Sequence, residues 1–214
     1  MNKKQLIFKY YKIINSIPFL NKIKGNVKII NNGAISRNCS IISTGKNNTV
    51  IFSGGGYYNN CSFLMYGDNG TIKIGPKCYA VNTEFYIEDA NGTIEVGKDT
   101  SLCGKAHFAV IEGTKIKIGE NCLFSSEITF RTGDSHSLLD LKGNRINPSK
   151  DIEIKDHVWI GHKVSINKGV TIQENSVIGT GAIVTRTFLE GNVVIAGVPA
   201  KIVKENINWD AKRI

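Results

Sequence analysis

The stretch of the chain best suited to chemistry is DSHSLLD, residues 134–140, in which His136 stands two positions after Asp134. A histidine with a pKa of about 6.5 can take up a proton at neutral pH, and general-base catalysis of this kind contributes roughly 10²- to 10⁴-fold to a rate. Asp134 could orient the ring or hold its proton, although a backbone carbonyl could do the same. Three other histidines lie in more regular parts of the chain: His107, His157 and His162.

The segments around DSHSLLD repeat every six residues. A helix of 3.6 residues per turn cannot keep such a stripe on one face, whereas short strands joined by tight turns can. The pattern therefore predicts one strand and one corner per hexad. The stripe consists of Ile118, Phe124, Phe130, Ile154, Ile160, Ile166, Ile172, Ile178 and Val184.

The N-terminal half repeats every 22 residues instead. TIKIG at 71–75 returns as TIEVG at 93–97 and as KIKIG at 115–119. Three hexads make an 18-residue coil, so this period implies about four added residues at one corner, where GDNG and ANG supply turn chemistry. The two periods together predict a parallel β-solenoid with coils stacked about 4.8 Å apart.

The five cysteines contain no CxxC pair, and their number is odd, so neither a zinc site nor a disulfide framework is expected. Cys39 and Cys61 are 22 residues apart, and Cys78 and Cys122 are 44 apart. This spacing predicts an internal ladder of small side chains.

The hexad stripe lapses once, over residues 131–151, which read RTGDSHSLLDLKGNRINPSKD. A break of this length inside a solenoid is usually functional. His136 lies in it and is therefore the strongest candidate base, the alternative being an exposed loop histidine without a role.

The units IGHKVS, IGTGAI and IGENCL, and the run from DHVWIG to VPAKIVKE, resemble the hexapeptide-repeat acyltransferases of the maltose and galactoside acetyltransferase-like branch. GDSHSLLDLKGNRIN resembles the segment found in bacterial capsule and sialic-acid O-acetyltransferases. The resemblance covers residues 115–205 well. It implies an all-β fold, a left-handed parallel β-helix, which is an exception to right-handed crossovers. It also implies a homotrimer with active sites between subunits, and acetyl-CoA as donor.

Domain boundaries follow from these patterns. We expect a basic amphipathic helix over residues 1–25, the β-helix with its loop excursion over 26–205, and a short tail or helix over 206–214. Residues 1–67 contain nine Lys or Arg and no Asp or Glu, so the whole net charge of +9 arises there. The helix either caps the solenoid or attaches it to an anionic membrane.

The composition also limits location and partners. No apolar run approaches the ~20 residues of a membrane-spanning helix, and the N-terminus does not read as a signal peptide. We expect a cytoplasmic protein, free or peripheral at the inner membrane face. No nucleic-acid-binding motif is found.

The resemblance assigns roles residue by residue. It makes His136 the general base and places Trp159 at the wall of the transfer site, where its indole N–H or a backbone N–H would stabilise the oxyanion; the alternative for Trp159 is packing at the subunit interface. Asp134 is the candidate partner of His136 by its position alone. Lysine at the last two donor positions replaces the arginine of several family members. The coenzyme A positions are Trp159, Gly161, His162, Thr180, Thr185, Arg186, Lys201 and Lys204. The acceptor candidates come from position instead: Arg145 and Asn147 lie in the excursion, and His107 is on an outward face upstream of it.

The function predicted is direct transfer of an acetyl group from acetyl-CoA to a sugar hydroxyl of a bacterial surface polysaccharide, of capsule, O-antigen or sialic-acid type, with no metal. One alternative is an N-acetyltransferase acting on an amino sugar or nucleotide sugar. A second is a γ-type carbonic anhydrase, since His157 and His162 are five residues apart. A third is a non-catalytic scaffold.

Overall fold

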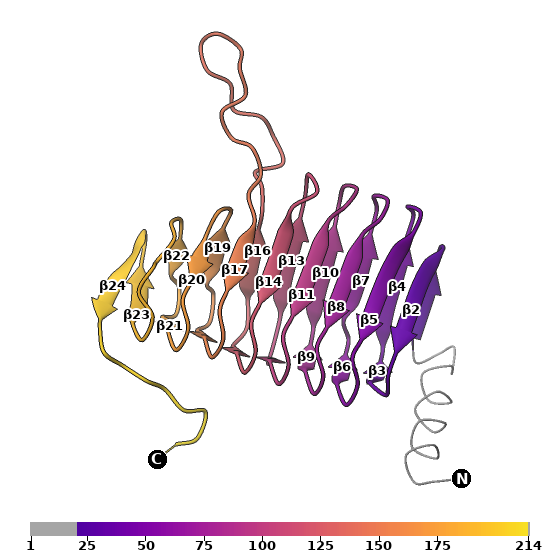
Figure 1. Ribbon diagram of the computed structural model, residues 1–214, viewed down its shortest axis with the longest axis horizontal. Coiled ribbons are helices and arrows are strands. Elements are labelled where there is room, and N and C mark those ends of the chain that lie inside the picture. The colour runs from indigo at the N-terminus through magenta and orange to yellow at the C-terminus, as the bar shows by residue number, and fades with distance from the viewer. Residues whose placement is uncertain (1–20, 214) are drawn as a thin grey trace.

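The protein forms a parallel β-solenoid with three sheets, shown by the computed structural model, which describes residues 21–213 (Figure 1). The chain passes through sheet A, sheet B and sheet C in turn, so each coil has an A–B, a B–C and a C–A corner. Those described residues contain no helix. The predicted left-handed parallel β-helix is confirmed.

Each sheet gathers every third strand of the chain. Sheet A comprises β1 (Asn21–Lys24), β4 (Cys39–Ser43), β7 (Ser62–Met65), β10 (Thr83–Ile87), β13 (Ala106–Val110), β16 (Ile128–Arg131), β19 (Ser165–Asn167) and β22 (Ile183–Val184). Sheet B comprises β2 (Val27–Asn31), β5 (Asn48–Phe52), β8 (Thr71–Ile74), β11 (Thr93–Val96), β14 (Lys115–Ile118), β17 (Ile152–Ile154) and β20 (Thr171–Ile172). Sheet C comprises β3 (Ile35–Arg37), β6 (Tyr57–Asn59), β9 (Tyr79–Val81), β12 (Ser101–Leu102), β15 (Leu123–Phe124), β18 (Trp159–Ile160), β21 (Val177–Ile178), β23 (Val194–Gly197) and β24 (Ala200–Lys204).

The period-six stripe forms the inner wall of the solenoid. Ile154, Ile160 and Ile166 lie in sheets B, C and A, and every member of the stripe is buried. Six residues thus carry the chain from one sheet to the next, and eighteen return it to the same sheet. Apolar burial along these rows is the main stabilising term of the fold.

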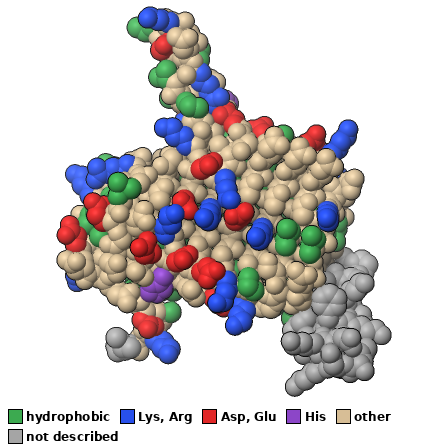
Figure 2. Space-filling view, viewed as in Figure 1, with side chains coloured by type: hydrophobic (Ala, Val, Ile, Leu, Met, Phe, Trp, Pro, Cys, Tyr) green, Lys and Arg blue, Asp and Glu red, His purple; other side chains and the backbone are tan. Residues whose placement is uncertain are grey.

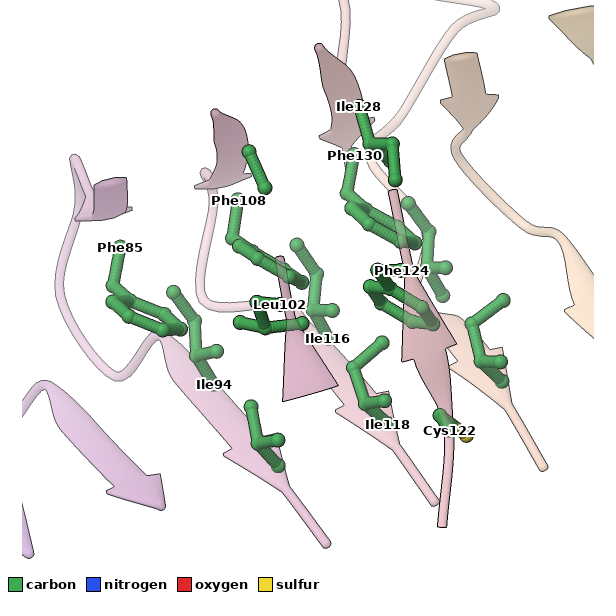
Figure 3. Packing of buried hydrophobic residues seen from close by; sticks show 14 of the residues in the cluster. Phe85, Ile94, Leu102, Phe108, Ile116, Ile118, Cys122, Phe124, Ile128 and Phe130 are labelled. Atoms are coloured by element: carbon green, nitrogen blue, oxygen red, sulfur yellow. The ribbon is translucent and has the colours of Figure 1, made fainter. Parts of the chain in front are cut away.

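An aromatic ladder runs up the inside of sheet A. Phe63, Phe85, Phe108 and Phe130 stack with ring centroids 5.0, 5.2 and 4.7 Å apart, and Figure 3 shows the last three of them pointing into the core in parallel. Because β7, β10, β13 and β16 pair in register, identical side chains repeat at each rung.

The added residues of the 22-residue coils lie at the A–B corner. GDNG separates β7 from β8, and DANG separates β10 from β11. The predicted cysteine rungs are also confirmed, since Cys39, Cys61, Cys78 and Cys122 are buried.

Both ends of the solenoid differ from the expectation. Asn21–Lys24 form β1, paired in parallel with β4, rather than the end of a helix, because their alternating side chains continue the sheet A rows. Residues 1–20, to which the rest of the predicted helix and its membrane contact belong, lie outside the described residues. At the other end β24 folds back antiparallel on β23, which the hexad pattern does not indicate.

Charged side chains of both signs are interleaved on the surface seen in Figure 2. On sheet B, for example, Lys73, Glu95, Lys117 and Glu153 occupy successive rungs. Within residues 21–213, no helix is long and apolar enough to cross a membrane.

Candidate active site

A projecting arm, residues 132–151, leaves the solenoid at the A–B corner between β16 and β17 (Figure 1). Its two limbs are joined by an antiparallel bridge between Leu139 and Arg145. This A–B corner is the one at which the upstream 22-residue coils carry their added residues. His136 lies near its root.

Asn147 holds the root of the arm together. Its Oδ1 accepts hydrogen bonds from the N–H of Leu138 at 2.7 Å and from Arg145. Its Nδ2 donates to the carboxylate of Asp134 at 2.7 Å and to the carbonyl of His136 at 2.9 Å. The side chain is 7% exposed and its hydrogen-bonding capacity is filled. Asn147 therefore has a structural role at the root of the arm, and its expected contact with the acceptor stays a prediction.

Two ion pairs tie the root to the solenoid. Asp134 pairs with Lys168, which follows β19, and this ammonium also donates to the carbonyl of Asn147 at 3.0 Å. Arg145 pairs with Glu112 at 2.7 Å. Lys168, and then Asn147, hold the pKa of Asp134 below its ordinary value, as Arg145 does for Glu112.

The main chain of His136 is thus fixed while its ring is exposed. Ser135 before it has a left-handed backbone, with φ of 65°. The imidazole makes no hydrogen bond, ion pair or ring contact with another residue of the described range 21–213, and the Asp134 carboxylate bonds to Lys168 and Asn147 instead. Asp134 is therefore linked to the His136 main chain by way of Asn147, and its predicted role as partner of the base stays a prediction.

Trp159 stands on the outer face of sheet C and is 41% exposed. The C-terminal segment folds back beside it, with the Trp209 ring 6.1 Å from that of Trp159. Trp209 also stacks on His157 at 4.2 Å, with planes 12° apart, and its indole N–H donates to the His157 carbonyl at 2.9 Å. The tail, without regular structure, thereby covers one side of Trp159.

Three of the predicted donor residues meet at the C–A corner. A Cβ on Gly161 would lie 2.8 Å from the backbone nitrogen of Thr180 in the next coil, so this position requires glycine. The carbonyl of His162 accepts the N–H of Gly181 at 2.8 Å, and its Nδ1 lies 2.8 Å from Oγ of Ser126. The corner thus stacks tightly, with Thr180 exposed beside it.

The remaining donor candidates lie at three different places. Lys201 of β24 pairs with Ala196 of β23, and the neighbouring Ile195 accepts the N–H of Gly179 at the C–A corner. Lys201 therefore lies near the same corner. Lys204 lies at the far end of β24. Thr185 and Arg186 follow β22 at the A–B corner, where the guanidinium of Arg186 stands 5.2 Å from the centre of the Phe188 ring.

His107 projects from the outer face of β13 on sheet A. Its Nδ1 lies 2.9 Å from Oε1 of Glu84 in β10. It lines a cavity of about 490 Å³ at the C–A corner. The His107 side chain is therefore accessible to a ligand, as a residue that binds the acceptor substrate must be.

One chain does not bring the proposed base and the donor corner together. His136 belongs to the A–B corner, whereas Trp159 lies in sheet C and His162 at the C–A corner. His157 and His162 stand at opposite ends of β18, and His157 is covered by Trp209, so they do not form a zinc site within one chain. Residues 21–213 contain no group of three His, Cys, Asp or Glu that could hold a metal ion.

The sequence did not reveal Lys168, Glu112 or Trp209. Lys168 and Glu112 occupy ordinary A–B corner positions, and only the folded arm brings them to Asp134 and Arg145. For Trp209 a signal existed, since a tryptophan in a polar tail is costly to leave in water.

Residues 151–186 match the family described as bacterial transferase hexapeptide (six repeats). The chain is 38% identical to the galactoside O-acetyltransferase of Escherichia coli K12 over 99 residues, 46% of this chain and 48% of that protein. It is 34% identical to the polysialic acid O-acetyltransferase of Neisseria meningitidis over 110 residues, 51% of each.

Among solved structures, the polysialic acid O-acetyltransferase OatWY superimposes with a TM-score of 0.70 at 31% identity, covering 91% of this chain and 92% of that one. The chain belongs to the hexapeptide-repeat transferase family. It spans about half the length of the curated relatives that it matches.

Proposed function

We propose that the protein is an acetyl-CoA-dependent O-acetyltransferase that acetylates a hydroxyl of a bacterial surface polysaccharide. The observation that carries this proposal is the arm, whose root fixes the main chain of His136 and leaves the imidazole open to solvent. The named activities of the relatives, O-acetylation of galactosides and of polysialic acid, support it.

The reaction follows from the chemistry of a histidine base. His136 takes the proton of the acceptor hydroxyl as the oxygen attacks the thioester carbonyl carbon. An N–H, from the backbone or from the Trp159 indole, stabilises the oxyanion. The carbon–sulfur bond then breaks, and the coenzyme A thiolate recovers the proton from the imidazolium. The products are an O-acetyl sugar and free coenzyme A.

The donor would bind along the C–A corner. Gly161 lets adjacent coils approach closely there, and Thr180 beside it is exposed. Lys201 supplies a cation near the same corner for a phosphate of coenzyme A. Thr185, Arg186 and Lys204 do not gather at this corner in one chain.

The separation of His136 from Trp159 favours a site shared between subunits of a homotrimer. The arm also exposes Leu138, Leu139, Leu141 and Ile146 by 59% or more. Four large aliphatic side chains on one projecting segment favour contact with a partner. A second copy of the chain, placing its donor corner against the arm, would cover them and complete the site.

Replacing His136 tests the proposed role. We expect His136→Ala to lower kcat of acetyl transfer about 10²- to 10⁴-fold, measured as coenzyme A release with a panel of galactosides and sialic acid oligomers. Ser137→Ala is the control, because Ser137 is an exposed neighbour of His136 in the same arm. Unchanged kcat in the His136 variant would move the base elsewhere.

The same assay separates O- from N-acetylation. Amino sugars and nucleotide-linked amino sugars are offered beside the hydroxyl acceptors, and the products are identified by mass and by alkaline lability, which only the ester shows. Transfer to amines alone would favour the N-acetyltransferase alternative.

A further inference from the structure

A cavity of about 490 Å³ lies at the C–A corner of the 22-residue coils, upstream of the arm and outside the hexapeptide match at residues 151–186. This volume is within the usual range of ligand pockets, roughly 300–1,000 Å³. The side chains that matter for its chemistry are Asn60, Ser62, Asn82, Glu84, Lys105 and His107.

A ladder of asparagine amides forms one side of this cavity. Asn38 donates from Nδ2 to Oδ1 of Asn60 at 3.1 Å, and Asn60 donates in the same way to Asn82 at 2.6 Å. On the following coil the residue at the same corner position is Lys105, which has no amide, so the ladder ends at Asn82. Within residues 21–213 the Nδ2 of Asn82 has no further partner, which leaves two N–H donors at the cavity.

The rest of the cavity lining offers acceptors and a cation. Glu84 is held by His107 through Oε1, so its Oε2 and the Nε2 of His107 remain available to a ligand. Lys105 is exposed and has no ion-pair partner among the described side chains. Side-chain donors and acceptors therefore both line the cavity, which suits a ligand rich in hydroxyl groups.

The cavity and the donor corner lie on one edge of the solenoid. The strand pairing stacks Asn82, Lys105, Glu127 and Lys163 on successive coils. Glu127 in turn lies 3.7 Å from Nε2 of His162. Lys105 is therefore two coils, about 10 Å, from the donor corner. A sugar bound in the cavity would therefore lie beside the sugar unit being acetylated and would not occupy that unit's place.

We propose that this cavity is a carbohydrate subsite that binds a sugar unit of the acceptor other than the unit being acetylated. The acceptor is then an oligosaccharide or a longer glycan rather than a monosaccharide. This inference rests on the proposed function for the identity of the reaction, and on the cavity alone for the binding of sugar.

Acceptor length is the variable that tests it. We expect kcat/KM to rise from monosaccharide to tetrasaccharide in galactose and sialic acid series, because extra units add binding in the cavity. Asn82→Gly and Lys105→Ala should lower the ratio of tetrasaccharide to monosaccharide kcat/KM about tenfold, chiefly through KM for the longer acceptor. Coenzyme A release measures both parameters.

Asn69→Gly is the matched control. Asn69, like Asn82, has a left-handed backbone, with φ of 58° against 51°, and belongs to an amide ladder, with Asn47 and Asn91. That ladder lies at the A–B corner, away from the cavity. Glycine is tolerated at such φ values, so both variants should fold. The control should keep the wild-type length ratio.

Two results would overturn the subsite. One is a wild-type kcat/KM that does not depend on acceptor length, and the other is an Asn82→Gly variant that matches Asn69→Gly. Binding of the same tetrasaccharides without acetyl-CoA, followed by calorimetry, separates the two proposals. If no sugar is acetylated but Asn82→Gly still weakens binding, the subsite stands and the proposed function fails.

Discussion

Asp134 makes the root of the arm sensitive to acid. Lys168 and Asn147 lower its pKa, so the carboxylate stabilises the root at every pH above the unfolded value of about 3.9, and this contribution is lost as the pH falls through the folded pKa. We expect the arm to keep its protection between pH 7 and pH 5 and to loosen below about pH 4. Hydrogen exchange of peptides spanning residues 132–151 measures this change.

Asp134→Asn removes this charge and should reduce both the protection at neutral pH and its loss in acid. Asp140→Asn is the control, because Asp140 bonds only to residues of the arm's own tip, such as Asn144. A root that loosens in acid to the same degree with Asn at 134 would show that Asp134 does not hold it.

Single residues mark the limit of what the sequence could predict about the site. The placement of His136 outside the coils was predictable because the hexad stripe lapses around it, while its role as the base stays a prediction. Asn147 was placed with the acceptor, but its amide fills four hydrogen bonds within the root. This role of Asn147 depends on the irregular fold of the arm, which follows no sequence repeat. The spacing of residues in the sequence therefore does not indicate it.

At the scale of the element, the C-terminal segment covers Trp159 through Trp209. These are the chain's two tryptophans, so replacing Trp209 leaves Trp159 as the sole indole fluorophore. We expect Trp209→Ala to expose Trp159, with a red-shifted emission and stronger quenching by acrylamide. Trp209→Phe should have a smaller effect, because it keeps the stack on His157 and loses only the N–H bond.

Both variants have the same fluorophore, which makes the comparison between them direct. Equal quenching in the two would show that the stacked ring does not cover Trp159. The hairpin and tail that bring Trp209 there were not predictable, since β23 and β24 end the hexad pattern and pair antiparallel. The strands before them were predictable, because their buried residues recur every six positions in the C-terminal half and every 22 in the N-terminal half.

At the scale of the whole molecule, the arm and the donor corner lie on different sides of one chain. Two coupled features favour their meeting across an interface: the separation of His136 from Trp159 and the exposed aliphatic side chains of the arm. We expect light scattering to give the mass of a trimer, and Leu139→Asp with Leu141→Asp to reduce it.

A shared site makes a sharper prediction about mixed assemblies. His136→Ala and Trp159→Ala should each be nearly inactive alone. Assembled together at equal amounts, they should recover about one quarter of wild-type activity, because one in four interfaces of a cyclic trimer then joins an intact His136 to an intact Trp159. Mixing His136→Ala with His136→Gln should recover no activity, because both variants lack the imidazole and no interface can supply it. No recovery in the first mixture would place both residues' functions within one chain, and the arm would then have to fold back across sheet B to reach Trp159.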